Sequence, residues 1–122
     1  MKASVFSGVL LVVILLLVLS NTLFVRRVTN TVLDMIARLP DHPSETAVDM
    51  AEEILSYLES KETLLSLSVP YQTLDRSVEL AGSLKEYAAT GSRIEYTATK
   101  ALLTDAIKDM GRLETPDAKN IF

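Results

Sequence analysis

Residues 3–25 of the chain read ASVFSGVLLVVILLLVLSNTLFV, and this run contains no charged side chain. Its middle, residues 9–19, is unbroken Val, Leu and Ile, and its polar residues lie towards the two ends. About 20 consecutive apolar residues in a helix cross the roughly 30 Å hydrocarbon core of a bilayer. The run therefore predicts a transmembrane anchor over residues 1–27, with charged residues flanking it on both sides.

A cleaved signal peptide is the alternative interpretation of the same run. The apolar core of a signal peptide is normally about 7–15 residues long and is followed by an A-x-A-like cleavage site. Here the run is longer, and Leu19-Ser20-Asn21-Thr22 matches such a site poorly. We therefore expect an uncleaved anchor, and a mature chain that starts after Ser20 would contradict this.

The charges that flank the run leave its orientation open. Because cytoplasmic loops carry an excess of Lys and Arg, Arg26 and Arg27 against Lys2 would place the rest of the chain in the cytoplasm. A difference of one or two charges decides little, and bacterial proteins that begin in this way commonly carry an extracytoplasmic domain. We expect the cell membrane, crossed once, with residues 28–122 outside; the cytoplasmic orientation is the alternative.

The domain that follows the anchor is acidic. All sixteen acidic residues lie in residues 28–122 with nine of the twelve basic ones, which gives this segment a net charge of −7. Nucleic-acid binding depends on neutralising phosphates with Lys and Arg, so this class of function is excluded. Anionic lipid headgroups would also repel such a domain, and we expect it to stand away from the bilayer.

The first helix is predicted to continue beyond the membrane. Val28, Val32 and Ile36 recur at helical spacing, and no helix breaker appears before Pro40. One helix from about residue 3 to residue 38 would be roughly 54 Å long. Because only its first part fits in a bilayer, the rest should form a rigid stalk that packs against the domain.

Proline and glycine divide the domain into helices at about 28–38, 44–67, 70–89 and 93–113. Ser44 is suited to cap one helix at its start, and Gly91 to end another in the left-handed conformation. Gly82 lies inside a helix, where it is unfavourable, so a close contact between helices is expected there.

The short turns make sequential helices antiparallel. The predicted fold class is all-α: an N-terminal transmembrane helix that continues as a stalk into a small antiparallel helical bundle with helical-hairpin character. The apolar residues at helical spacing are expected to be buried, and they are Ala47, Met50, Ala51, Ile54, Leu55, Leu58 and Leu65; Leu74, Val78, Ala81, Leu84 and Ala88; and Ile94, Ala98, Leu102, Leu103, Ile107 and Met110. The four tyrosines should lie at the edge of this core: Tyr57, Tyr71, Tyr87 and Tyr96.

The search for chemical motifs predicts no catalytic residue, no cofactor and no metal site, and hence no enzyme. The chain has no Cys, and its single His, His42, lies in a proline-flanked turn where exposure to solvent is expected. Asp105 and Asp109 are one turn apart and could share a cation. Because Lys108 and Arg112 alternate with them, a solvated face of ion pairs is the favoured interpretation.

A family resemblance rests on two short segments. Leu64-Leu65-Ser66-Leu67, followed by Asp75, and then Leu84-Lys85-Glu86-Tyr87 resemble the bacterial domain-of-unknown-function family numbered 4363. The closing segment, residues 114–122, is also similar, so the resemblance covers essentially the whole chain. Leu58 stands about where the family often has a Trp. The resemblance implies a Gram-positive or clostridial-type source and a membrane-anchored accessory protein without assigned activity, whose partner would be a small multi-pass membrane protein.

Two functions follow from this sequence. The first is a non-enzymatic accessory subunit that enters the bilayer through residues 3–25 and docks onto another membrane protein. Ser4, Ser7 and Gly8 favour it, because small residues allow helices to approach closely in lipid. The alternative is a membrane-anchored binding or sensing module for a peptide or a cation. The alternative predicts an apolar groove on residues 28–122, whereas the first predicts apolar exposure chiefly on the anchor and stalk.

Overall fold

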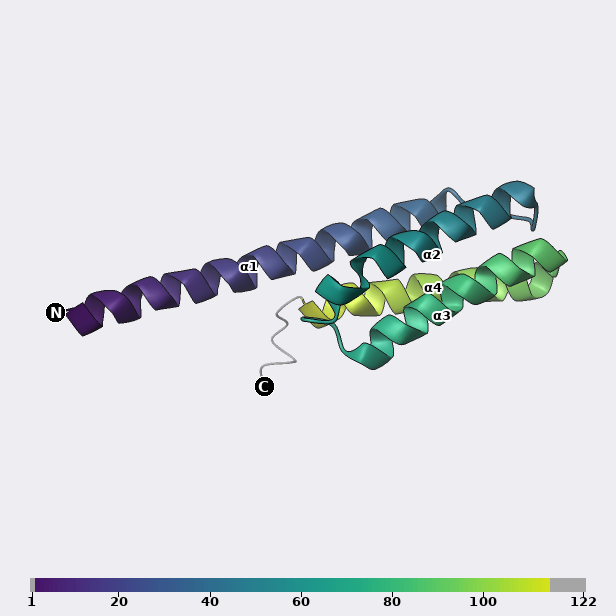
Figure 1. Ribbon diagram of the computed structural model, residues 1–122. Helices are drawn as coiled ribbons and strands as arrows, with labels where there is room; N and C mark the ends of the chain where they lie inside the picture. Colours follow the sequence, from purple (N-terminus) through teal and green to yellow (C-terminus); the bar gives the residue numbers. More distant parts are fainter. Residues whose placement is uncertain (1, 115–122) are drawn as a thin grey trace.

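The computed structural model describes residues 2–114, and over these residues the chain forms four helices and no strand (Figure 1). The helices are α1 (Lys2–Ala37), α2 (Glu45–Leu65), α3 (Tyr71–Thr90) and α4 (Arg93–Glu114). The predicted all-α class is confirmed, and the predicted helix ends agree with these bounds within two residues. Most of the closing segment of the family resemblance, from residue 115, lies outside the described residues.

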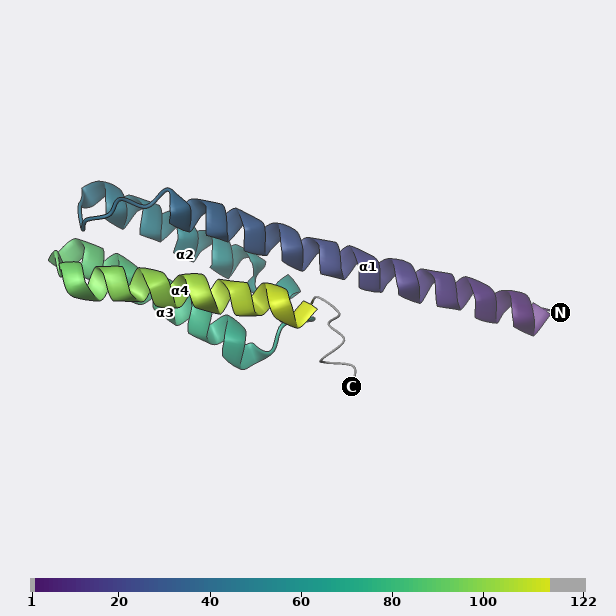
Figure 2. The ribbon, with the colours of Figure 1, turned by 180° about the vertical axis from the view of Figure 1, so that it is seen from behind.

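The four helices run alternately up and down. Each helix packs against its two neighbours in a ring, α1 with α2, α2 with α3, α3 with α4, and α4 back with α1. Figures 1 and 2 show that the first half of α1 extends well beyond this bundle, whereas its second half forms one of the four sides. At 1.5 Å per residue the 36 residues of α1 span about 54 Å, the length predicted for the anchor and stalk together.

Local residue chemistry ends the helices where it was expected to. The Ser44 hydroxyl accepts a hydrogen bond of 3.1 Å from the backbone N–H of Ala47, which satisfies one free donor at the start of α2. Gly91 ends α3 in the left-handed conformation with φ of 74°, and its N–H bonds to the Tyr87 carbonyl. A residue with a Cβ would be strained at this φ, so the glycine is required for the tight turn into α4.

The core lies between the second half of α1 and the inner faces of the other three helices. On α1 it begins at Val25, which is fully buried, and continues one turn at a time through the predicted stripe. The predicted faces of α2 and α3 also point inward, although Met50, Leu55 and Val78 are half-buried where burial was predicted. The buried apolar residues of α1 to α3 are Val25, Val28, Val32, Ile36, Ala47, Ala51, Ile54, Leu58, Leu65, Leu74, Ala81, Leu84 and Ala88.

The predicted face of α4 is half wrong. Ile94, Ala98 and Leu102 are exposed, Ile94 to 86%, although Leu103, Ile107 and Met110 are buried as expected. The inward face is completed by Tyr96, Thr99 and Ala106. Tyr96 is buried because its hydroxyl donates a 2.7 Å hydrogen bond to the Pro40 carbonyl in the α1–α2 connection. A polar partner of this kind cannot be recognised from apolar periodicity.

Tyr96 and Tyr71 both depart from the expected edge of the core. Tyr96 is completely buried, and Tyr71 is 68% exposed at the start of α3. Tyr57 and Tyr87 are half-buried and do edge the core, as expected.

The close helix contact occurs at a different glycine from the one expected. No neighbouring atom lies within 4 Å of the position that a Cβ would take at Gly82. A Cβ at Gly111 would lie 3.1 Å from Cγ2 of Thr29, where α4 meets α1. Gly82 therefore tolerates a side chain, whereas Gly111 permits a close contact of α4 with the stalk at Thr29.

Candidate functional site: the protruding helix and its junction with the bundle

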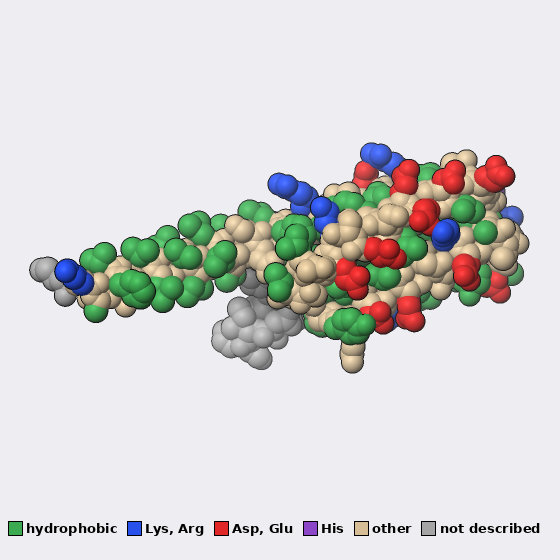
Figure 3. Space-filling view, viewed as in Figure 1, with side chains coloured by type: hydrophobic (Ala, Val, Ile, Leu, Met, Phe, Trp, Pro, Cys, Tyr) green, Lys and Arg blue, Asp and Glu red, His purple; other side chains and the backbone are tan. Residues whose placement is uncertain are grey.

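The outstanding surface of the molecule is the protruding half of α1. Within the described residues, one helix is long and apolar enough to cross a membrane, and none of its most apolar 18-residue window is buried. Figure 3 shows apolar side chains along the visible face of this part of the helix and one basic group at its tip. The exposed large apolar residues here are Val5, Phe6, Val9, Leu10, Leu11, Val12, Val13, Ile14, Leu15, Leu16, Leu17, Val18 and Leu19. A core helix of a soluble protein would be covered by its own chain, and this one is not.

Polar residues mark the level at which the protruding helix enters the bundle. Thr22 returns its hydroxyl to the Val18 carbonyl at 3.0 Å, so it needs no water partner. Asn21 donates through Nδ2 to the hydroxyl of Ser68, in the turn between α2 and α3. This bond fastens the α2–α3 turn to α1 just past its most apolar residues.

Charged residues begin just beyond Asn21, after an uncharged segment of α1. Arg26 and Arg27 are exposed on α1 within two turns of Asn21. Figure 3 shows basic groups near the junction and acidic side chains spread over the bundle beyond it. The apolar run is thus bounded by Lys2 at one end and by the arginine pair at the other.

Two hollows lie on the bundle and at its junction with the protruding helix. An open cleft of about 330 Å³ between α3 and α4 has a mainly polar lining, formed by Gln72, Thr73, Arg76, Ala106 and Asp109. A mostly apolar groove of about 320 Å³ lies at the junction and is lined by Leu17, Ser20, Asn21, Phe24, Leu64 and Leu67. The apolar groove therefore belongs to the junction with α1, not to a separate binding face of the bundle.

The residues considered for chemistry remain apart from one another. His42 is exposed in the α1–α2 connection, as expected. Asp109 pairs with Arg112 at 3.2 Å, and both side chains are more than half exposed, in agreement with one pair of the predicted face. Among residues 2–114, no group of three or more His, Cys, Asp and Glu side chains is placed to hold a metal ion.

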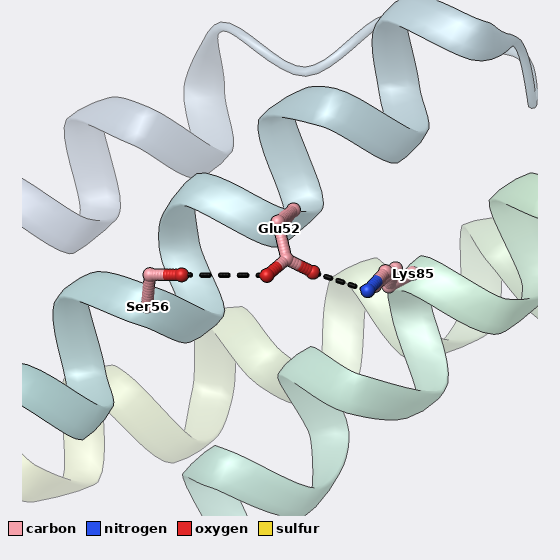
Figure 4. Close-up of polar contacts among 3 residues, drawn as sticks. All are labelled: Glu52, Ser56 and Lys85. Carbon is pink, nitrogen blue, oxygen red and sulfur yellow. Dashed lines mark hydrogen bonds and ion pairs between the residues drawn. The ribbon is translucent and has the colours of Figure 1, made fainter.

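One polar cluster joins two helices of the bundle (Figure 4). Glu52 of α2 pairs with Lys85 of α3 and accepts a 3.4 Å hydrogen bond from the Ser56 hydroxyl. The hydrogen bond from Lys85, and then its positive charge, lower the pKa of Glu52, and the same contact raises the pKa of Lys85. Both side chains remain roughly half exposed, so solvent screens the pair and its role is to connect α2 and α3.

Comparison of this chain with protein-family models, with curated proteins and with solved structures gave no match. The resemblance to the domain-of-unknown-function family therefore stays a prediction. The junction residues Ser68, Leu64 and Leu67 were not singled out as functional from the sequence. Leu64 and Leu67 were noted only as part of the family resemblance, and the Pro70 break located a turn without showing what lies beside it.

Proposed function

We propose that this protein is a non-enzymatic, single-pass membrane protein that serves as an accessory subunit of a membrane protein complex. The observation that carries the proposal is the protruding half of α1, which is apolar and exposed on every side. It belongs to the same continuous helix whose second half packs into the bundle. From Lys2 to Ser20 the helix is about 28 Å long, close to the thickness of the hydrocarbon core. A bilayer is the solvent that suits such a surface.

Association with another membrane protein is supported by small residues on the protruding helix. Ser4 and Gly8 are one turn apart, and nothing lies within 4 Å of the position of a Cβ at Gly8. A notch over Gly8 is lined by valines of the same helix. Because close backbone approach is what favours helix association in lipid, this face fits a transmembrane helix of a partner. The predicted family relationship implies a small multi-pass protein in that role.

The distribution of exposed apolar residues favours an accessory subunit over a binding module. Thirteen of the exposed large apolar residues lie between Val5 and Leu19, and Leu23 extends them. On the described bundle the exposed ones are Leu64, Leu67, Tyr71, Ile94 and Leu102. A peptide-binding module requires an apolar groove of its own, whereas the α3–α4 cleft is polar.

Size analysis of the natural assembly tests the proposal. The full chain, gently solubilised from native membranes, should migrate with a partner and not as a monomer. Gly8→Leu should release the monomer, because the added side chain fills the notch. Leu10→Phe is the matched control, since it adds bulk on the other side of the helix and should leave the complex intact. A wild-type chain that is monomeric throughout would refute the accessory role.

The side of the membrane decides which partners are possible, and we propose an extracytoplasmic bundle in the cell membrane. The chain has no Cys, and Ser60 is exposed on α2, so Ser60→Cys provides a single accessible thiol. A membrane-impermeant thiol reagent applied to intact cells should label it. Labelling only after lysis would instead place the bundle in the cytoplasm, as the arginine pair alone would predict.

A further inference from the structure

Exposed apolar side chains gather at one end of the bundle. Leu64, Leu67 and Tyr71 lie at the α2–α3 turn and are 53%, 76% and 68% exposed. More than half of each of these side chains is exposed, and none belongs to the buried core. In the part of the chain that the structure describes, this is the largest group of exposed apolar residues outside α1.

The α2–α3 turn lies at the level where α1 leaves the bundle. The Asn21–Ser68 hydrogen bond fixes this level, and the apolar groove runs from Leu17 of α1 to Leu67 of the turn. Figures 1 and 2 both show the turn at the end of the bundle that faces the N-terminus of α1. The apolar surface of the protruding helix is therefore continuous with that of the turn.

We propose that the α2–α3 turn is a second membrane contact, with Leu64, Leu67 and Tyr71 inserted in the bilayer interface beside α1. The proposal rests on the proposed function, because it requires α1 to span the bilayer. A helix of about 28 Å from Lys2 to Ser20 puts Asn21, and with it the turn, at the boundary between acyl chains and headgroups. Leucine side chains suit the acyl region there, and the tyrosine ring suits the interface.

The charges of the bundle are arranged to suit the same orientation. The end near the turn, taken as residues 21–30, 60–77 and 108–114, has six basic residues and four acidic ones. The rest of the described bundle, residues 31–59 and 78–107, has four basic residues and eleven acidic ones. Most of the acidic charge that was expected to hold the whole domain away from the bilayer thus lies in the rest of the bundle, beyond the end near the turn (Figure 3). Anionic headgroups would attract the near end and repel the far end, which holds the bundle upright.

Tryptophan fluorescence in vesicles tests the proposal with the full chain, which has no Trp of its own. Three single substitutions are compared: Leu67→Trp at the turn, Val12→Trp in the apolar run, and Ile94→Trp at the far end of the bundle. Ile94 is the matched control because it is an apolar residue with 86% exposure. The vesicles contain phosphatidylcholine and phosphatidylglycerol with acyl chains brominated either near the glycerol or near the chain end. Far-UV circular dichroism identical to wild type establishes that each variant is folded.

The proposal predicts strong quenching of Leu67→Trp emission by bromine near the glycerol and weaker quenching by bromine near the chain end. Val12→Trp should show the reverse preference, and Ile94→Trp should be quenched by neither lipid. If Leu67→Trp behaves like Ile94→Trp while Val12→Trp is quenched, α1 spans the bilayer and the second contact is wrong. If Val12→Trp is not quenched, the anchor itself fails. A blue-shifted but unquenched Leu67→Trp emission would mean that protein covers the turn, which also overturns the proposal.

Discussion

The two halves of α1 have similar apolar residues and opposite surroundings. From Val5 to Leu19 every large apolar side chain is between 44% and 70% exposed, whereas Val25, Val28 and Val32 are at most 1% exposed. Nothing breaks the helix between them. The difference lies in what separates the apolar residues: more of the same in the first half, and polar or charged residues in the second. A helix that is apolar on every side is typical of a membrane span or a deeply buried core helix. A helix with a single apolar stripe packs that stripe against a protein core.

One continuous helix thus has an exposed apolar half and a half that packs in the bundle, with Asn21 near the boundary between them. On the bundle side Arg26, Arg27 and Asp34 face water, and the stripe opposite them packs on α2 and α4. On the other side, residues 2–20 are all exposed. The same substitution should consequently have different effects in the two halves, and this can be measured.

The largest difference between the two halves of α1 is expected when one carboxylate is introduced into each of them in turn. Val32→Asp buries an unpaired carboxylate between helices and should cost about 3–5 kcal/mol of stability, enough to unfold a small bundle. Leu15→Asp should leave bundle stability unchanged and instead weaken membrane insertion by about 2.5–3.5 kcal/mol. Urea unfolding in mild detergent, followed by near-UV circular dichroism, measures the first. The fraction of chain retained in carbonate-washed membranes measures the second.

Either variant could disprove the distinction between an exposed and a packed half of α1. A Leu15→Asp variant with a lowered urea midpoint would show that residues 5–19 contribute to the bundle core. A Val32→Asp variant with an unchanged midpoint would show that the stalk does not pack as described.

The next effect concerns neighbouring leucines on α4, which packs against the stalk. Leu103 is fully buried and Leu102 is 44% exposed, although the sequence pattern predicted burial for both. Leu103→Ala should cost about 2–5 kcal/mol, because it leaves a cavity in the core. Leu102→Ala should change stability by no more than about 0.5 kcal/mol. If both variants lower the urea midpoint equally, Leu102 is buried as the sequence pattern predicted, and the observed inward face of α4 is wrong.

The sequence was sufficient for the fold class because its signals are local. Pro40, Pro43 and Pro70 break the helical pattern, Ser44 and Gly91 cap helices, and the stripe on α1 repeats every three to four residues. These features depend on neighbours along the chain, so the helix ends were predicted within two residues. The protruding, uncovered run was equally evident, because no amphipathic pattern interrupts it.

What the sequence did not show depends on partners distant in the chain. The burial of Tyr96 needs the Pro40 carbonyl, 56 residues away. The placement of the α2–α3 turn beside Asn21 needs the Ser68 hydroxyl, 47 residues away. Gly82 and Gly111 look alike in sequence, and only the helix packing reveals that Thr29 lies against Gly111. The junction between the protruding half of α1 and the bundle is built from contacts of this kind, so it was missed.

A smaller effect is expected where the stalk meets α4. In a helix, Ala is more favourable than Gly by about 1 kcal/mol, but a Cβ at Gly111 would crowd the Thr29 methyl group. Gly111→Ala should therefore gain little or lose stability in the wild-type chain. In a Thr29→Ala background, where the methyl group is absent, it should stabilise the bundle by up to about 1 kcal/mol. Urea midpoints of the four chains measure this coupling.

Gly82→Ala is the control for the glycine pair. Because nothing lies within 4 Å of its Cβ position, it should stabilise the protein by about 1 kcal/mol in either background. Additive effects of Thr29→Ala and Gly111→Ala would mean that α4 does not press on the stalk at this point.

The smallest effect is expected from an exposed ion pair, a feature that the charge-free half of α1 lacks altogether. Since the Glu52 pKa is lowered on folding, its contribution to stability is present above the unfolded pKa of about 4.5 and is lost as the pH falls through the folded value. The raised pKa of Lys85 gives a contribution that is present below about 10.5 and is lost as the pH rises further.

Lys85→Met should accordingly lower the urea midpoint slightly at pH 7. The deficit should disappear in acid below the Glu52 pKa, where the wild-type carboxyl is also neutral. Lys108→Met removes the same charge from an exposed site on α4, and its difference from wild type should not follow the Glu52 titration. If both variants vary with pH alike, the net charge of the bundle governs the response and the Glu52–Lys85 contact does not.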